Sequence, residues 1–305
     1  MLARTYTVGF AGKGFWRAIF AMFGLFFVLR VSAEVAVVDD AGHKVTLTSP
    51  AMRVVSLAPN ITEILFFIGA GEQVVGVVEY SDFPPAAREL PVIGAHNRFD
   101  VEQILSLKPD LIVGWLSGNS QDDLQGLKQL GLPVFISEPG TVDDIVSLME
   151  RLGELTGHQV QSLSQASAFR ASINASRETY STRRPVSVFY QVWEQPIYTL
   201  NGDHVISQLI SLCGGRNIFS DLKQLAPVVS LESVLARDPE VIVGGGVFGR
   251  TPPWAERWQS WPTMRAVRNR HIYAVDSDHI ARMGPRLAEG MEALCVVIDK
   301  ARHPS

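Results

Sequence analysis

The sequence contains little cysteine and no concentrated positive charge. Only two of its 305 residues are cysteines, which excludes a small fold held together by many disulfides. The 27 Lys and Arg residues form no basic run and are outnumbered by 31 Asp and Glu residues, giving a formal net charge of −4. Nucleic acid is therefore not expected as a partner, because the chain has no basic patch to meet a phosphate backbone. A hydrophobic content of 47% also excludes a disordered chain, and the length allows one large domain or two ordinary ones.

Familiar catalytic and metal-binding motifs are absent as well. The chain has no G-x-S-x-G nucleophile elbow, no Walker A phosphate loop and no H-E-x-x-H zinc motif. None of its seven histidines pairs with another at i, i+2 or i, i+4 spacing, so the sequence offers no preformed metal site. We predict no catalytic residue, no metal and no cofactor. An exported enzyme with a convergent active site is kept as an alternative from a different class.

Residues 1–33 have the composition of a secretory signal peptide. Arg4, Lys13 and Arg17 make a positive start without any acidic residue, and residues 18–29 form a 12-residue apolar run. At 1.5 Å per residue this run is too short to cross about 30 Å of hydrocarbon. Small residues at positions 31–33 then provide a cleavage site, so we predict a mature chain that begins at Glu34. The alternative is a retained N-terminal membrane anchor.

The two cysteines fit an exported protein. Cys213 and Cys295 are an even pair, and neither belongs to a C-x-x-C motif. In an oxidising compartment such a pair favours a disulfide over a metal or redox site. The alternative is two buried free thiols.

Short strands of β-branched residues alternate with helical stretches along most of the chain. Residues 35–38 and 45–48 flank a turn and predict a hairpin, while Asn60 and Glu63 resemble a capping box that opens a helix ending at Gly69. The alternation predicts a parallel α/β sheet. Its expected elements are strands at residues 53–58, 74–78, 111–115 and 133–137, with helices at residues 101–107 and 122–130.

A long helical segment divides the chain into two α/β lobes. Residues 142–182 contain no proline and carry apolar residues at helical spacing, which predicts one long helix, with an interruption at Gly157 as an alternative. A second alternation begins at Val186. We therefore predict an α/β fold of two Rossmann-like lobes joined by one long helix, with a first lobe at residues 34–140, the helix at residues 141–184 and a second lobe at residues 185–305.

The two lobes repeat one another. VEQILSLKPDLIVG from Val101 and LESVLARDPEVIVG from Leu231 align without gaps at an offset of 130 and share six identical positions. Most of these are core positions or the proline that ends a helix. Glu102 and Glu232 are different, because a charge at the start of a short helix is seldom buried. Their ordinary interpretation is a favourable contact with the helix dipole.

Aromatic residues follow several predicted strands, at the edge where open α/β sheets place ligand crevices. Tyr80, Trp115 and Trp193 each come just after a buried strand. Flat and rigid side chains on two facing lobes suit a large planar or amphipathic ligand. The alternative for each is ordinary core packing.

The sequence resembles a known family, the periplasmic cobalamin-binding proteins of bacterial ABC importers. More broadly it is similar to the helical-backbone receptors for siderophores and haem. The resemblance covers residues 35–301 and is carried by residues 53–87, the long helix, the Cys-Gly-Gly at Cys213 and SDHIARMGPR from Ser277. The Tyr80-Ser81-Asp82 segment and the paired cysteines are typical of the cobalamin branch.

The resemblance implies a class III periplasmic binding protein that captures a corrinoid between its lobes, is a monomer when free, and delivers the ligand to a permease dimer in the inner membrane. It assigns Glu102 and Glu232 to permease docking. His96 departs from the family pattern, which has an aromatic residue there, and an Fe-siderophore or haem receptor is the alternative. Arginines around Arg282 and Arg286 would favour an anionic chelate, and aromatic walls would favour the corrin. The expected ligand-binding residues are Tyr80, His96, Trp115, Trp193, Ser277, Asp278, His279, Ile280 and Ala281.

Overall fold

The computed structural model describes residues 1–7, 9, 34–247 and 252–303. It divides into residues 1–33 and residues 34–305, and all the helices and strands described here belong to the second unit. Residues 1–7 and 9 form neither helix nor strand, while the apolar run and the cleavage site predicted at residues 18–33 lie outside the described residues. Among the residues that are described, no helix is both long enough and apolar enough to span a membrane.

The first lobe contains a parallel sheet with the strand order β4-β3-β7-β8. All four strands, both expected helices and the N-terminal hairpin were predicted from the sequence, and each is confirmed to within a few residues. The elements are β1 (Val35–Val38), β2 (Lys44–Leu47), β3 (Val54–Ser56), α1 (Pro59–Phe67), η1 (Gly71–Gln73), β4 (Val74–Val77), η2 (Pro85–Glu89), β5 (Gly94–Ala95), β6 (Arg98–Phe99), α2 (Val101–Ser106), β7 (Leu111–Trp115), α3 (Gln121–Gln129) and β8 (Val134–Ser137).

The predicted capping box at the start of α1 is wrong. The N-cap residue is Ala58, which has no side-chain cap, and Pro59 occupies the first turn. Proline suits that position because it lacks the N–H that a cap would satisfy. The side chains of Asn60 and Glu63 instead contact residues of the second lobe, at Met283 and at Arg282 and Arg286. Asn60 and Glu63 therefore form contacts between the lobes and do not cap the helix.

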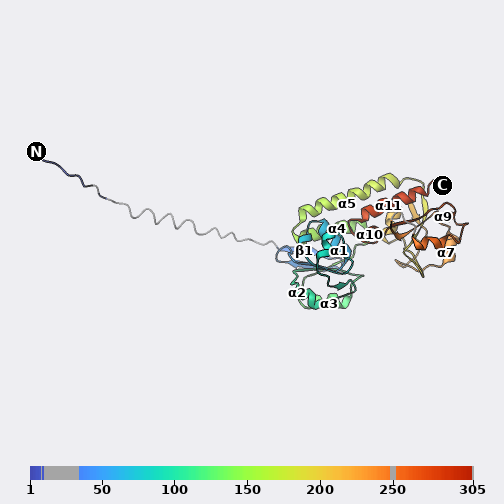
Figure 1. Ribbon diagram of the computed structural model, residues 1–305, viewed down its shortest axis with the longest axis horizontal. Helices are drawn as coiled ribbons and strands as arrows, with labels where there is room; N and C mark the ends of the chain where they lie inside the picture. The colour runs from blue at the N-terminus through green and yellow to red at the C-terminus, as the bar shows by residue number, and fades with distance from the viewer. Residues whose placement is uncertain (8, 10–33, 248–251, 304–305) are drawn as a thin grey trace. The chain divides into compact units, whose positions relative to one another are not determined.

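The long helical segment is not one continuous helix. It is interrupted at Gly157, which confirms the alternative given by the sequence. Helix α4 (Val142–Thr156) ends there, and Gly157 adopts the left-handed conformation with φ of 75°. Helix α5 (Gln159–Tyr180) then connects the lobes, because it packs against α4 at one end and against α6 and α11 of the second lobe. In Figure 1, α5 is the long yellow-green helix running beside α4 and α11.

The second lobe repeats the first, with the strand order β12-β9-β13-β14. Strands β7 and β13, which carry the repeated sequence, take the same third place in their sheets, so the repeat found in the sequence is a structural repeat. The elements are β9 (Val186–Gln191), β10 (Trp193–Glu194), β11 (Ile197–Tyr198), α6 (Val205–Leu212), β12 (Gly215–Asn217), α7 (Leu231–Arg237), β13 (Val241–Gly246), α8 (Pro253–Trp258), α9 (Arg265–Arg268), β14 (Ile272–Asp276), α10 (Ser277–Ile280) and α11 (Leu287–Lys300).

One hydrophobic core runs through both lobes. Successive residues of a strand point to opposite faces of the sheet, so Leu111 and Val241 join this shared core, whereas Ile112 and Ile242 join separate outer clusters, one in each lobe. Buried residues of α4, α5, α6 and α11 complete the shared core. The two lobes are therefore packed onto a common helical layer.

The predicted disulfide between Cys213 and Cys295 is present, with a sequence separation of 82 residues. Cys213 caps the C-terminus of α6 and Cys295 lies within α11, so the bond fastens one end of α6 to the helix that packs against α5.

Candidate functional site

A cavity of about 340 Å³ lies between the two lobes. The carboxyl ends of strands β7 and β8 open onto it from the first lobe, as expected for a ligand crevice in open parallel sheets. Its lining from the first lobe is Pro59, Asn60, His96, Trp115, Ser117 and residues 138–140. Its lining from the second lobe is residues 203–205, Leu225 and residues 281–283.

The first-lobe wall is built on Trp115 and His96. Their rings lie 6.2 Å apart between centroids and are tilted by 39°. The buried side chain of Asn119 holds both residues, since its Oδ1 accepts a hydrogen bond from the Trp115 N–H at 2.6 Å and its Nδ2 donates to the His96 carbonyl at 2.6 Å. The backbones that carry the two aromatic rings are therefore linked to each other through Asn119.

The second-lobe wall is more apolar and continues into a smaller cavity of about 180 Å³. His204, Ala281 and Met283 line both cavities, and Ser277 and Ile280 line the smaller one. Tyr190 also lines it, and burial raises the pKa of this phenol, which keeps it neutral. Of the expected segment from Ser277 to Ala281, three residues thus face these cavities.

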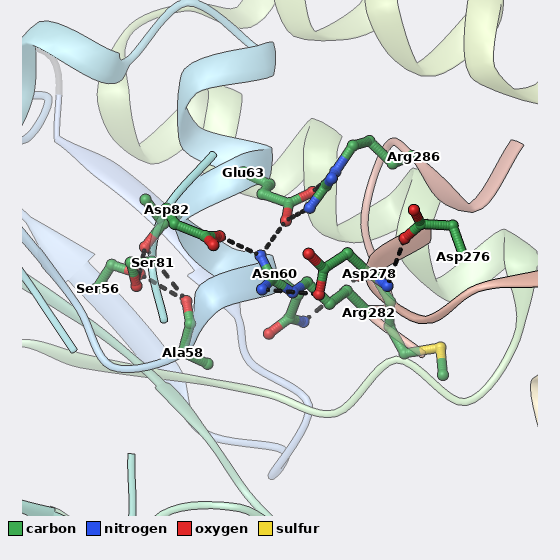
Figure 2. Close-up of polar contacts among 12 residues, drawn as sticks. Ser56, Ala58, Asn60, Glu63, Ser81, Asp82, Asp276, Asp278, Arg282 and Arg286 are labelled. Atoms are coloured by element: carbon green, nitrogen blue, oxygen red, sulfur yellow. Dashed lines mark hydrogen bonds and ion pairs between the residues drawn. The ribbon is translucent and has the colours of Figure 1, made fainter. Parts of the chain in front are cut away.

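A cluster of charged residues joins the lobes at one edge of the cleft (Figure 2). The Glu63 carboxylate of α1 accepts two hydrogen bonds from Arg286, at 2.9 and 2.6 Å, and one from Arg282 at 2.9 Å. Arg282 also contacts Asp82 at 2.9 Å and Asp278 at 3.0 Å. The Glu63 side chain is only 1% exposed, so its charge depends on these arginines for compensation.

The pKa shifts show that the ion pairs stabilise the charged forms of Arg282, Arg286 and Asp82. Burial alone would lower the pKa of Arg282, but hydrogen bonds to Asp82 and Glu63 outweigh it and the pKa is raised. Hydrogen bonds to Glu63 raise the pKa of Arg286. Burial acts to raise the pKa of Asp82, and the Arg282 guanidinium overcomes it and lowers that pKa below its usual value. Three carboxylates therefore face two guanidiniums, which leaves little positive charge to attract an anion into the cleft.

Tyr80 and Trp193 are exposed and line neither cavity. Tyr80 is 73% exposed and has a positive φ of 64°, and it lies two residues before Asp82 of the charged cluster. Trp193 is 63% exposed and follows Val192, which lines the smaller cavity. Both residues are therefore close in sequence to residues of the cleft or of the charged cluster, and both rings are exposed.

Asp278 and His279 contact other protein groups. Asp278 pairs with Arg282, as described above, and His279 Nδ1 lies 3.6 Å from a carboxylate oxygen of Glu289 on α11. Neither residue lines the two cavities.

Glu102 and Glu232 occupy matching positions in the two lobes. Each is an exposed residue in the first turn of a short helix, α2 or α7, that leads into the third strand of its sheet. The N-caps are Asp100 and Ser230. A hydrogen bond from its own backbone N–H, together with one from Ser230, lowers the pKa of Glu232. This carboxylate is therefore ionised and accessible at neutral pH.

Sequence reasoning did not identify Asn119, His204 or Glu63 as site residues. Asn119 and His204 gave no local signal, since neither belongs to a motif with a recognisable spacing. Glu63 gave a misleading signal, because its spacing from Asn60 matched a capping box. Arg282 and Arg286 were noticed for their charge, but their carboxylate partners lie up to 223 residues away along the chain.

Comparison with known proteins gives consistent matches over most of the chain. The model of the periplasmic binding protein family matches residues 54–279. The vitamin B12-binding protein of Vibrio cholerae is 37% identical over 254 residues, which cover 83% of this chain and 91% of the relative. The vitamin B12-binding protein of Yersinia pestis is 36% identical over 252 residues, covering 82% and 88%.

Solved structures agree with these matches. The crystal structure of the periplasmic vitamin B12-binding protein of Vibrio cholerae superposes with a TM-score of 0.75 over 83% of this chain and 98% of that chain. A periplasmic haem-binding protein from a Roseiflexus species, in its apo form, has a TM-score of 0.72 and 27% identity, covering 82% and 99%.

The charged cluster predicts a large cost for removing its central carboxylate. The substitution Glu63→Ala leaves two partly buried arginines without their shared partner, and we expect the free energy of unfolding to fall by about 3 kcal/mol or more. Urea denaturation of the oxidised protein measures this. The control is Glu289→Ala on α11, whose carboxylate is 66% exposed and only approaches His279, and there we expect a change within about 0.5 kcal/mol. Equal stability of the two variants would contradict the central place of Glu63.

Proposed function

Because this chain belongs to the periplasmic binding protein family, we propose that it captures a corrinoid, cobalamin or a close relative, in the cleft between its lobes and delivers it to an ABC importer. The chain is a solute-binding protein and not an enzyme. The observation that carries the choice of ligand is the cleft itself, in which aromatic rings on one wall face an apolar wall on the other and the nearby arginines are neutralised. The relatives named as vitamin B12-binding proteins support the same choice.

The charge state of the cleft favours a corrinoid over an anionic chelate. A ferric siderophore with net negative charge, or the propionates of haem, would need free cations, whereas Arg282 and Arg286 are already engaged by Glu63, Asp82 and Asp278. A corrin ring carries uncharged amide side chains, which neutral donors and apolar walls can bind. Haem stays the second candidate, because His96 lines the cavity and imidazole is a common iron ligand.

The size of the cavity gives the exposed aromatic residues a role. A volume of about 340 Å³ is near the lower end of the range for drug-sized ligands, so a macrocycle with its side chains would extend beyond it. Tyr80 and Trp193 are exposed and close in sequence to residues at the cleft, and such a ligand would extend onto their rings. We therefore propose both as ligand contacts, with Trp115 as the partly buried anchor.

Ligand binding is tested with single alanine variants. We expect Trp115→Ala to weaken cyanocobalamin binding about thirtyfold, or by about 2 kcal/mol, because a packed aromatic anchor is lost. Tyr80→Ala and Trp193→Ala should weaken it less, since their rings are exposed. Isothermal titration calorimetry measures all three. The control is Val160→Ala on α5, which removes an exposed apolar side chain that lines neither cavity. We expect no change in its affinity for cyanocobalamin. Wild-type affinity in Trp115→Ala would reject this cleft as the corrinoid site.

Docking to the importer is assigned to Glu102 and Glu232. The structural repeat gives each lobe one exposed carboxylate at the same place, and a dimeric permease presenting paired arginines would match such a pair with bidentate contacts. We expect the double substitution Glu102→Arg with Glu232→Arg to abolish corrinoid uptake in cells and to leave the affinity of the purified protein unchanged. The matched control reverses Glu72 and Glu154 instead, two carboxylates outside the repeated helices. Normal uptake by the docking variant would remove this role, whereas lost ligand binding would place the glutamates in the fold or the cleft.

Export with cleavage after Ala33 is the last part of the proposal. It rests on the positive start, the short apolar run and the small residues that precede Glu34. We expect the mature protein to be a monomer that begins at Glu34 and carries the Cys213–Cys295 disulfide. Intact mass of periplasmic protein, taken after treatment with a thiol alkylating agent, measures both features at once. A retained extension of 33 residues would contradict cleavage, and two alkylated cysteines would contradict the bond.

A further inference from the structure

His204 stands at the point where the two cavities meet. Its ring lines both the larger and the smaller cavity, and it is the N-cap residue of α6. As the cap, its Nδ1 accepts a hydrogen bond from the backbone N–H of Ile206 at 3.2 Å. One nitrogen of the imidazole is therefore committed to the helix, and the ring has its other nitrogen, Nε2, left for a further contact.

The cap fixes which nitrogen carries the proton. A neutral imidazole has one donor and one acceptor nitrogen, so an accepting Nδ1 requires the proton to be on Nε2. The ring is neutral at pH 7, because burial lowers the pKa of His204 to about 4. Within the described part of the chain, no hydrogen bond is formed by Nε2. The other titratable groups lining the larger cavity are His96, Glu138, Asp203 and Arg282.

The backbone around His204 is held in place at both ends of α6. On the N-terminal side, Asn201 Oδ1 accepts a hydrogen bond from the Asp203 N–H at 3.0 Å and so fixes the loop that precedes the ring. On the C-terminal side, Cys213 is bonded to Cys295 of α11. A donor carried on such a fixed element loses little freedom when it binds a ligand.

We propose that His204 orients the ligand by donating a hydrogen bond from Nε2–H to a carbonyl oxygen of the ligand, such as an amide of a corrin side chain. This inference rests on the proposed corrinoid function and adds to it a specificity residue on the second-lobe wall. The proposal also excludes metal coordination by His204, because Nε2 carries the proton. Coordination through Nε2 would need the proton to move to Nδ1, which would break the bond to Ile206.

Three substitutions separate the donor from the cap. Asn, Asp and Ser are all good N-cap residues, so each variant preserves the hydrogen bond to Ile206 and should unfold at nearly the wild-type temperature. Only His204→Asn also provides a side-chain N–H, while His204→Asp has the same shape without a donor and His204→Ser is short and uncharged.

Affinity for cyanocobalamin, measured by calorimetry at pH 7, tests the donor. We expect His204→Asp and His204→Ser to bind about tenfold more weakly than wild type, and His204→Asn to recover part of that loss, because its amide N–H is a donor that reaches less far than Nε2–H. Wild-type affinity in the Asp and Ser variants would overturn the proposal.

Two further measurements distinguish failure of the His204 proposal from failure of the proposed corrinoid-binding function. Imidazole ¹⁵N shifts of the ligand-free protein should show His204 protonated on Nε2, and protonation on Nδ1 would overturn the proposal whatever the ligand is. Diaquacobinamide has exchangeable water ligands at both axial positions of its cobalt, and its bound absorption spectrum should be the same for wild type and His204→Asn. A spectral change that depends on His204 would show coordination and overturn the donor role. Failure of wild-type protein to bind any corrinoid would count against the proposed function, while the ¹⁵N result would still decide the tautomer.

Discussion

The position of the two lobes depends on one buried carboxylate. Glu63 belongs to the first helix of the first lobe, yet its ionic partners Arg282 and Arg286 belong to the second lobe. A buried charge of this kind is tolerated only with its partners in place, so any arrangement of the lobes that separates Glu63 from these arginines leaves Glu63 and Arg286 without their ionic partners, while Arg282 keeps Asp278. The contact has a further consequence for chemistry, since it uses the guanidiniums that would otherwise give the cleft a positive charge. The same interaction thus fixes the geometry of the cleft and determines the kind of ligand that suits it.

The helical layer extends this constraint to the cleft walls. Arg286 immediately precedes α11, and α11 packs against α5, α6 and α10 while it is bonded to α6 through Cys295. Because the main hydrophobic core contains strands of both lobes together with these helices, the sheets share one packed interior and do not form two independent domains. The cleft is therefore an opening at the edge of a continuous core. We expect ligand capture to involve small adjustments of side chains and loops more than a swing of one lobe against the other.

Local patterns in the sequence are sufficient to predict the elements and the repeat, and insufficient to predict the contacts between lobes. The strands and helices follow from periodicity, and the constant offset of 130 residues is enough to place Glu102 and Glu232 at matching sites. Asn60 and Glu63 show where this reasoning ends. Their spacing is satisfied equally by a helix cap and by a tertiary contact, and only the packing of α1 against the segment that includes Met283 decides between them. The aromatic residues show the same limit, because all three lie at or after the end of a buried strand, yet Trp115 lines the cavity while Tyr80 and Trp193 are exposed and line neither cavity.

Three residues that face the cleft, Trp115, His96 and His204, are held by hydrogen bonds in which one partner is a main-chain group. Asn119 fixes the backbones of Trp115 and His96, and the start of α6 fixes His204 through the N–H of Ile206. An arrangement of this kind is already ordered in the free protein, so binding immobilises few additional rotamers and more of the buried apolar area contributes to affinity. Recognition also depends on shape and on neutral donors, because the charges of Arg282 and Arg286 near the cleft are paired with Glu63 in the contact between the lobes. A large ligand with an apolar face and an uncharged polar rim meets both conditions, and this is the chemical description of a corrinoid.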